Sequence, residues 1–381
     1  MDEQTTRWGE KQPEGPALKT QSPAPTHVLL RYLSGVLFSR VMFSCAILVG
    51  LMEILALLEQ TTPILQRHLG VSGILTYAGM RLPFLMAGAL PLGVLIGALI
   101  MLTQMTLASE MAILQASGLS MWGLYKRLIP ATLIIGVMGV VLDDQVTPRS
   151  EQALAAWWNR TDPHPENGHA FWFHEGGRIG RVHYVADGGN MLSGLDLYTR
   201  TPNGLLHKAM HAERADYTHA HGWQLHAITG IEVDGNKTAR LPVEADAAWQ
   251  TTLHPWDFIR LSAENPPLSS GTIIGMLRGR LPSDSSPGFL QAGLLERFLR
   301  PAAMMVLLLL AMPVIYIPPR TGTRSWVPVW CLGAGLLFII AQGLLRAMGN
   351  AGLLPPPVAT IPGLIIFTLG AATALLRNEA K

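Results

Sequence analysis

Six long apolar runs constrain this 381-residue chain more than any other feature. They lie at residues 36–58, 81–103, 123–142, 298–317, 326–345 and 356–376. Each is about 20 residues long, the length of a helix that crosses a hydrocarbon core of about 30 Å. Because the centre of a bilayer offers no water to backbone N–H and C=O groups, each run is expected to be a transmembrane helix. Six such runs are too many for the core of one soluble domain.

The composition changes between the third and fourth runs. Residues 143–290 hold ten of the twelve histidines. Short runs there alternate apolar and polar residues and are separated by Gly- and Asn-rich turn signals, which is typical of β-strands. The expected strands begin at Phe171, Arg181, Gly194, Gly204 and Trp223. We therefore predict an all-β, jelly-roll-like domain inserted into an α-helical membrane protein.

The distribution of basic residues predicts the orientation of the chain. In the termini and the short segments between the runs, eleven Lys and Arg residues lie on the side of both termini, whereas the other side has only Arg67, Arg81 and Arg346. The first side is expected to be cytoplasmic, with both termini inside, and the β domain is expected on the far side of the membrane. The expected organisation is a disordered cytoplasmic tail (1–27), helices one to three (28–142), a β domain with a linker over 262–290 (143–290), and helices four to six (291–381).

A short polar stretch joins the second and third spans. Residues 106–118 read as a surface helix, extending to about residue 122, with Glu110 near its start. An acidic residue there can complement the helix dipole, or it can bind a partner protein. The chain contains no phosphate-binding loop and no Gly-Lys dipeptide, so nucleotide-driven transport would need a separate ATPase. In that case residues 106–118 are expected to contact the ATPase.

Charged residues lie near the predicted outer ends of the first two spans. Glu53 and Glu59 belong to the first, and Arg81 begins the second. Such charges can snorkel or pair with each other, or they can bind a polar ligand. A guanidinium such as that of Arg81 suits a phosphate.

Small residues and prolines in the second span leave two alternatives open. Pro83, Pro91, Gly88, Gly93 and Gly97 lie there, and they indicate either close helix packing or a seam that opens.

The histidines of the β region suggest a metal only weakly. No pair comes with a carboxylate or cysteine at ligand spacing, and no catalytic arrangement can be recognised. We expect no metal site, no catalytic residue and no nucleic-acid partner.

Two segments resemble a known family. They are Leu90-Pro-Leu-Gly-Val-Leu-Ile-Gly-Ala-Leu99 and Ser109-Glu-Met-Ala-Ile-Leu-Gln-Ala-Ser-Gly-Leu-Ser120. With the order of three spans, β domain and three spans, they resemble the lipopolysaccharide-export permeases LptF/LptG, and Ala116-Ser-Gly118 is more similar to the G member.

The resemblance implies a heterodimer of two related permeases above a cytoplasmic ATPase dimer that binds ATP and Mg²⁺. The permeases extract lipopolysaccharide from the outer leaflet of the inner membrane. They pass it to periplasmic β-jellyroll domains that join a single-span partner and a bridge protein. The ATPase would contact Glu110, with Ser109, Ala116 and Gly118 around it.

Two departures from the family are visible. Ala108 stands where many members have an arginine, so one ATPase contact is missing. Ala56 stands where some members have a lysine, which directs attention to Arg67 and Arg81 with Glu53 and Glu59 as candidate lipid-headgroup residues.

The alternatives are a mechanotransmitting ABC-type subunit acting on a periplasmic partner and a non-transporting membrane-anchored binding protein. Six spans with an all-β insert argue against the first. In the second, the Glu110 segment would serve only to pack against the rest of the protein.

Overall fold

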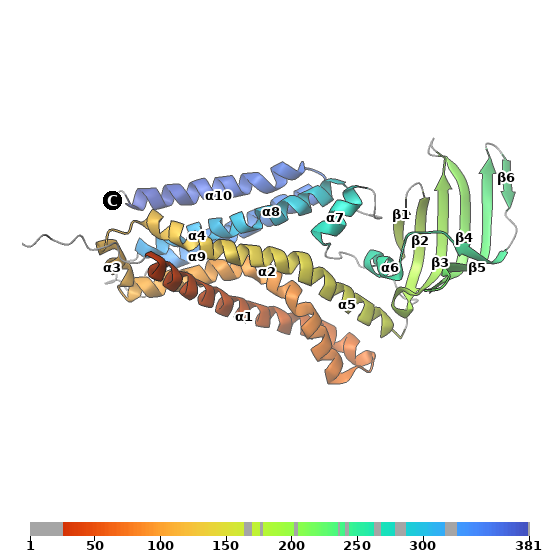
Figure 1. Cartoon of the computed structure of the whole chain (residues 1–381), viewed down its shortest axis with the longest axis horizontal. Coiled ribbons are helices and arrows are strands. Elements are labelled where there is room, and N and C mark those ends of the chain that lie inside the picture. The colour runs from red at the N-terminus through yellow and green to blue at the C-terminus, as the bar shows by residue number, and fades with distance from the viewer. Residues whose placement is uncertain are drawn as a thin grey trace, which may run out of the picture.

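The computed structural model describes residues 26–163, 170–175, 178–201, 205–234, 237–240, 244–262, 268–278, 287–316 and 326–379. A helical bundle occupies one end of the molecule and a β-sheet the other (Figure 1). The predicted disordered tail lies outside the described residues, apart from residues 26 and 27, which begin the first helix.

Within the described residues, the bundle contains six apolar helices long enough to cross a membrane, as predicted. They are α1 (Thr26–Gln66), α2 (Gly70–Leu107), α4 (Met121–Val141), α8 (Pro287–Ala311), α9 (Val327–Asn350) and α10 (Pro356–Glu379). Helix α4 continues through a π-helical turn, η1 (Leu142–Val146), into α5 (Thr147–Arg160), and α8 ends in a 3₁₀ turn, η4 (Met312–Tyr316).

Several helices extend well beyond the apolar runs. The 41 residues of α1 form a helix of about 60 Å, at 1.5 Å per residue, which is twice the thickness of a hydrocarbon core. The tip of the α1–α2 hairpin therefore projects on the side of the β domain, while the short helix α3 (Glu110–Ala116) and the C-terminus lie at the opposite end (Figure 1).

One apolar core holds the bundle together. Leu33, Leu37, Val41 and Cys45 form a stripe at four-residue spacing along α1, and each is at most 1% exposed. Of the 18 consecutive residues that make up the most apolar stretch of each helix, 67% are buried in α2, 22% in α1 and 17% in α9. Helix α2 is thus central, whereas α1 and α9 leave broad apolar faces uncovered.

The inserted β domain is confirmed. Its strands are β1 (Phe171–Glu175), β2 (Arg178–Ala186), β3 (Met191–Arg200), β4 (Leu206–Thr218), β5 (Gly222–Asp234), β6 (Lys237–Arg240) and β7 (Glu244–Trp249). All described pairings are antiparallel and follow the chain order from β1 to β6, with β7 also paired to β5. A full jelly roll divides its strands between two sheets, whereas these strands form one consecutive sheet.

A crease runs across four strands of this sheet. Buried side chains of a regular strand recur every two residues, but here they are three apart in each strand, at Val182/Val185, Leu192/Leu195, Ala212/Ala215 and Leu225/Ile228. The paired registers align these positions into two rows. Gly194 and Ala227 between the rows have φ of 61° and 52°. These left-handed residues keep both rows on the same face while the sheet bends.

Helix α6 (Pro255–Ser262) covers the apolar face of the sheet. Its Phe258 is fully buried, 5.5 Å from the ring of Phe173 and 5.2 Å from that of Trp223. The carboxylate of Asp257 accepts a hydrogen bond from the His254 N–H at 3.0 Å and so caps the start of the helix. Burial raises the pKa of Asp257, against the opposing effects of that hydrogen bond and of Arg260 at 3.3 Å.

The region predicted as β structure and linker also contains helix. Helix α5 occupies residues 147–160, before the first strand, and α7 (Ser270–Leu277) occupies part of the predicted linker. The Ser269 hydroxyl accepts from the Thr272 N–H at 3.2 Å and caps α7. Its apolar residues Ile273 and Met276 pack with Leu290, which joins α7 to α8.

Gly180 is expected to be essential for the β1–β2 pair. It lies opposite Phe173, and a Cβ atom on it would come within 2.1 Å of the ring. Gly180→Ala should destabilise the β domain by about 1–3 kcal/mol because the buried ring has no space to move. Denaturant unfolding measures this effect. A second change, Phe173→Leu, should relieve part of the loss, and equal stability of wild type and Gly180→Ala would contradict the packing.

Candidate functional site

Two regions contain the residues that the sequence singled out, one at each end of the bundle. The first is the segment from Ala108 to Ser120, between α2 and α4. Its helix α3 has seven residues, so it is shorter than the predicted 106–122, because residues to Leu107 belong to α2 and residues from Met121 belong to α4.

Local backbone chemistry sets the ends of α3. Ser109, with φ of 61°, interrupts the path from α2, and Glu110 begins the new helix. At the other end Gly118 has φ of 85°, and the N–H groups of Gly118 and Leu119 donate to the carbonyls of Gln115 and Leu114 at 2.9 and 3.1 Å. This pair of bonds is a Schellman motif, which favours glycine at the left-handed position.

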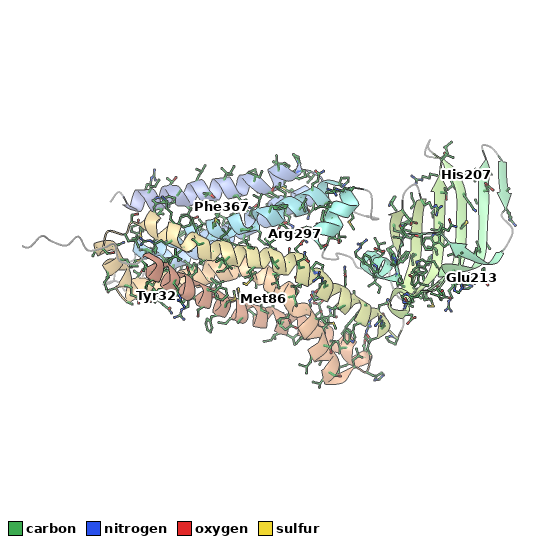
Figure 2. The ribbon with its side chains drawn as sticks, viewed as in Figure 1. Tyr32, Met86, His207, Glu213, Arg297 and Phe367 are labelled. Atoms are coloured by element: carbon green, nitrogen blue, oxygen red, sulfur yellow. The ribbon has the colours of Figure 1, made fainter. Side chains whose placement is uncertain are left out.

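Helix α3 is attached to the bundle on one side and open on the other. Met111 is 3% exposed and belongs to the bundle core, while the Tyr32 hydroxyl of α1 donates to Glu110 Oε2 at 3.2 Å. Tyr32 lies at this same end of the bundle (Figure 2). Ser109, Ala112, Ile113, Ala116 and Gly118 are exposed. The open side therefore combines small residues, one apolar side chain and a half-buried carboxylate, a surface suited to a groove on another protein.

The second region is the charged rim near the opposite end of α1 and α2. Both carboxylate oxygens of Glu53 and the Nε of Arg81 are buried without a hydrogen-bond partner. The guanidinium carbon of Arg81 lies 5.3 Å from the Phe84 ring and 5.8 Å from the Tyr77 ring. Glu59 is exposed. Arg81 thus retains unused donor capacity, as an anion-binding role requires.

Arg67 has a different environment from the other predicted rim residues. Its guanidinium donates to the Trp158 carbonyl, pairs with Asp162 at 3.1 Å, and lies 4.1 Å from the Trp158 ring centre. The side chain is 11% exposed. Arg67 therefore ties the tip of the α1–α2 hairpin to the end of α5, which leaves little of it for a ligand.

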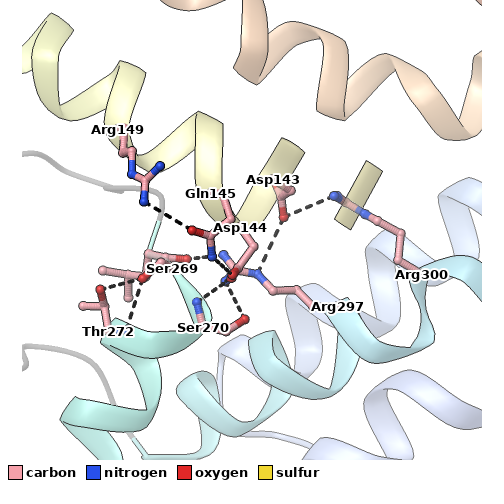
Figure 3. A network of polar contacts seen from close by, with 10 residues as sticks. Asp143, Asp144, Gln145, Arg149, Ser269, Ser270, Thr272, Arg297 and Arg300 are labelled. Atoms are coloured by element: carbon pink, nitrogen blue, oxygen red, sulfur yellow. Dashed lines mark hydrogen bonds and ion pairs between the residues drawn. The ribbon is translucent and has the colours of Figure 1, made fainter. Parts of the chain in front are cut away.

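Sequence reasoning missed several charged residues. Glu151 of α5 has a buried carboxylate oxygen without a hydrogen bond and interacts electrostatically with Arg81. Asp143, Asp144, Arg297 and Arg300 form a network at η1 (Figure 3). Its signal in the sequence was an acidic pair ending the third span and two arginines three residues apart beginning the fourth.

Three histidines of the sheet, His207, His211 and His226, have carboxylate partners on neighbouring strands. His211 lies 2.7 Å from Asp196, and His226 contacts both Asp216 and Asp246. Over the described parts of the chain, no three His, Cys, Asp or Glu residues gather in a way that could hold a metal ion.

The fold defines a class of protein: a multi-pass helical membrane protein with a β domain inserted between its third and fourth spanning helices. A sequence model described as "Lipopolysaccharide export system permease LptF/LptG" matches residues 31–377. The chain therefore belongs to the LptF/LptG family of lipopolysaccharide export permeases.

Relatives of this chain include proteins named "Lipopolysaccharide export system permease protein LptG". The protein of Escherichia coli (strain K12) is 21% identical over 361 residues, which cover 93% of this chain and 99% of the relative. That of Haemophilus influenzae is 21% identical over 325 residues, which cover 84% and 90%. Both names agree with the predicted similarity to the G member.

Proposed function

We propose that this chain is the non-catalytic permease subunit of an ATP-driven exporter, which extracts lipopolysaccharide from the outer leaflet of an inner membrane. It would pass the glycolipid to a periplasmic bridge of β-jellyroll domains. The observation that carries the proposal is α3, a separate short helix that begins at Glu110 and lies at the end of the bundle opposite the β domain.

The charge distribution supports this orientation. Arg31, Arg40, Lys126, Arg127 and Arg377 lie on the helices near the end that carries α3. By their place in the sequence, six more basic residues belong to the same side: Arg7, Lys11, Lys19, Arg320, Arg324 and Lys381. Arg81 lies near the other end, and so do Arg67, Arg297, Arg300 and Arg346, which pair with carboxylates. An excess of basic residues on one side is typical of the cytoplasmic side, so α3 would face the cytoplasm and the β domain the periplasm.

A separate ATPase dimer would supply the energy and bind ATP and Mg²⁺, because this sequence has no phosphate-binding loop. Helix α3 would dock into a groove on one ATPase subunit, with Ile113 and the small residues in the groove and Glu110 meeting a basic group. Transfer of lipid A chains out of a bilayer costs about 0.8 kcal/mol for each CH₂ group exposed to water, which accounts for the need for an external energy source.

The lipid path would run along α1, α2 and α9. Helices α1 and α9 are the least buried of the spanning helices over their apolar windows. Their free apolar faces suit acyl chains and a paralogous permease subunit. At the outer rim Arg81 would meet a headgroup phosphate, with Glu53 and Glu59 beside it. A single-span periplasmic partner would complete the assembly around the β domain.

Glu110→Gln tests the proposal because it removes the charge but keeps a hydrogen-bond acceptor for Tyr32. Loss of one partner of a buried charge pair costs about 2 kcal/mol or more, so the ATPase should bind about 30-fold more weakly. Co-purification and titration in detergent measure the affinity. Gln115→Ala, on the exposed surface of α3, is the matched control. Unchanged ATPase binding and glycolipid export in Glu110→Gln would overturn the proposed docking.

A further inference from the structure

The two connections between the bundle and the β domain meet at η1. The chain leaves the bundle through α4, η1 and α5, and it returns through α7 and α8. The close-up in Figure 3 shows side chains from η1, the start of α7 and α8 converging on one network. The outgoing and returning connections are therefore fastened to each other at the edge of the bundle.

Asp144 and Arg297 form the centre of this network. Asp144 Oδ1 accepts from Arg297 Nη1 and from the Ser270 N–H, each at 2.6 Å. Arg297 also donates to the Ser270 hydroxyl at 3.1 Å and to the Leu268 carbonyl. The guanidinium of Arg297, a residue of α8, thus binds both η1 and the beginning of α7.

Asp143 extends the network along α8. Its carboxylate lies 3.1 Å from Arg300 Nη1 and 3.6 Å from Arg297 Nε. Consecutive side chains of an α-helix point in directions about 100° apart at 3.6 residues per turn. A π-helical turn holds more residues than an α-helical turn, so consecutive side chains point in more similar directions. Asp143 and Asp144 of η1 accordingly both contact Arg297. Such turns are rare and frequently mark functional sites.

Stability alone does not account for an ionic network at this place. The side chains of Arg297 and Asp144 are only 13% and 16% exposed. Apolar residues of similar volume often stabilise such a site as well as an ion pair does. Directional charge pairs, however, fix one relative position of three helices, which uniform apolar packing specifies less well.

The segment through η1 reaches from α3 to the sheet. Ser120, four residues after the end of α3, caps α4 by accepting from the Gly123 N–H at 3.0 Å. At the far end, Asn159 of α5 donates to the Val185 carbonyl at 2.7 Å and accepts from the Gly188 N–H at 3.0 Å. One continuous helical segment therefore links the proposed ATPase contact to the β2–β3 turn.

We propose that Asp144 and Arg297 are positioning residues for transport, which hold α4–α5 and α7–α8 together so that movement at α3 turns the β domain over the bundle. This inference rests on the proposed function for its transport step. Its structural part concerns only the orientation of the β domain and can be tested without an ATPase.

The first experiment measures that orientation in the purified full-length chain in lipid nanodiscs. Spin labels are placed at Glu213→Cys on the sheet, labelled in Figure 2, and at Leu353→Cys in the exposed turn between α9 and α10. The native Cys45 and Cys331 are buried. Electron–electron distance measurements should give one narrow distribution in the wild type and a broad one in Asp144→Ala and Arg297→Ala.

Arg149→Ala is the matched control, since Arg149 is exposed and reaches the network only through Gln145 at 3.4 Å. It should keep the narrow distribution. Asp143→Asn, a smaller change, should broaden it partially and provides a variant if Arg297→Ala fails to fold. A narrow distribution in every folded variant of Asp144 and Arg297 would overturn the inference.

The second experiment uses the complete transporter with its ATPase. Asp144→Ala should keep ATPase binding and ATP hydrolysis but release about 5- to 150-fold less lipopolysaccharide for each ATP, the usual range of coupling between sites. Arg297→Lys should recover part of that ratio. Normal release per ATP in Asp144→Ala would contradict the positioning role, whereas absence of ATPase binding to the wild type would contradict the proposed function itself.

Discussion

Replacement of Phe258 by alanine is expected to destabilise the β domain by about 3–5 kcal/mol, the usual cost of removing a buried aromatic side chain. Phe258 is 0% exposed and lies within 6.0 Å of the rings of Phe173, Trp223 and Trp249. Its loss would remove the side chain that holds α6 against the sheet. Chemical unfolding followed by tryptophan fluorescence should show the change.

The control for this prediction lies on the same helix. Trp256 is two residues away and 47% exposed. Trp256→Ala should therefore change the unfolding free energy much less, although it also removes an aromatic ring. If both variants lose equal stability, the burial of Phe258 is not what attaches α6 to the sheet.

Gly97→Ala is expected to destabilise the bundle by about 1–3 kcal/mol, because an added methyl group would force α1 and α2 apart. A Cβ atom on Gly97 would lie 2.6 Å from Val41 Cα and 2.7 Å from Val41 N. Backbone atoms cannot move aside without shifting the helix. Thermal unfolding in detergent should show a lower transition temperature for this variant.

Gly88 provides the opposite case on the same helix. It is exposed, and apart from its chain neighbours and the backbone of its own helical turns, no atom of the described residues lies within 4 Å of the position that a Cβ atom would take on it. Gly88→Ala should be neutral or stabilise by about 0.5–1 kcal/mol, since alanine favours the helix. Equal losses in both variants would show that the closeness of α1 and α2 does not limit residue size at position 97.

The structure shows close helix packing, one of the two alternatives left open for the second span, at two of its glycines. At Gly97, and at Gly93 against Cys45, α2 approaches α1 too closely for a larger residue. Glycine at these two positions allows α1 and α2 to pack closely. The spacing Gly93-x-x-x-Gly97 is the small-residue pattern of helix contacts in membranes.

Much of the architecture could be predicted because its signals are local. The length of an apolar run is sufficient to predict a spanning helix, and alternation with turn residues located the starts of β1 to β5 to within three residues. The same approach missed α5, since its amphipathic sequence lies between an apolar span and β structure and was assigned to the inserted domain.

The candidate site could be predicted in part. Glu110 was found from its position in a short polar stretch, but its hydrogen bond to Tyr32 joins residues 78 positions apart. Similarly, Trp158 and Asp162, the partners of Arg67, are 91 and 95 residues away from it. No spacing rule connects residues at such separations. Arg67 and Arg81 therefore have different environments, although their positions in the sequence gave both the same predicted role.

By itself, the sequence determined six spanning helices, an inserted antiparallel sheet and the residue types at each end, because hydrophobic length and periodicity act within one segment. Only the tertiary structure decided that Arg67 is a tether while Arg81 keeps free donor capacity. It also decided that four strands bend along one crease and that Asp143 and Asp144 meet arginines some 150 residues away. The physical reason is that packing and charge pairing depend on which distant segments the fold brings together.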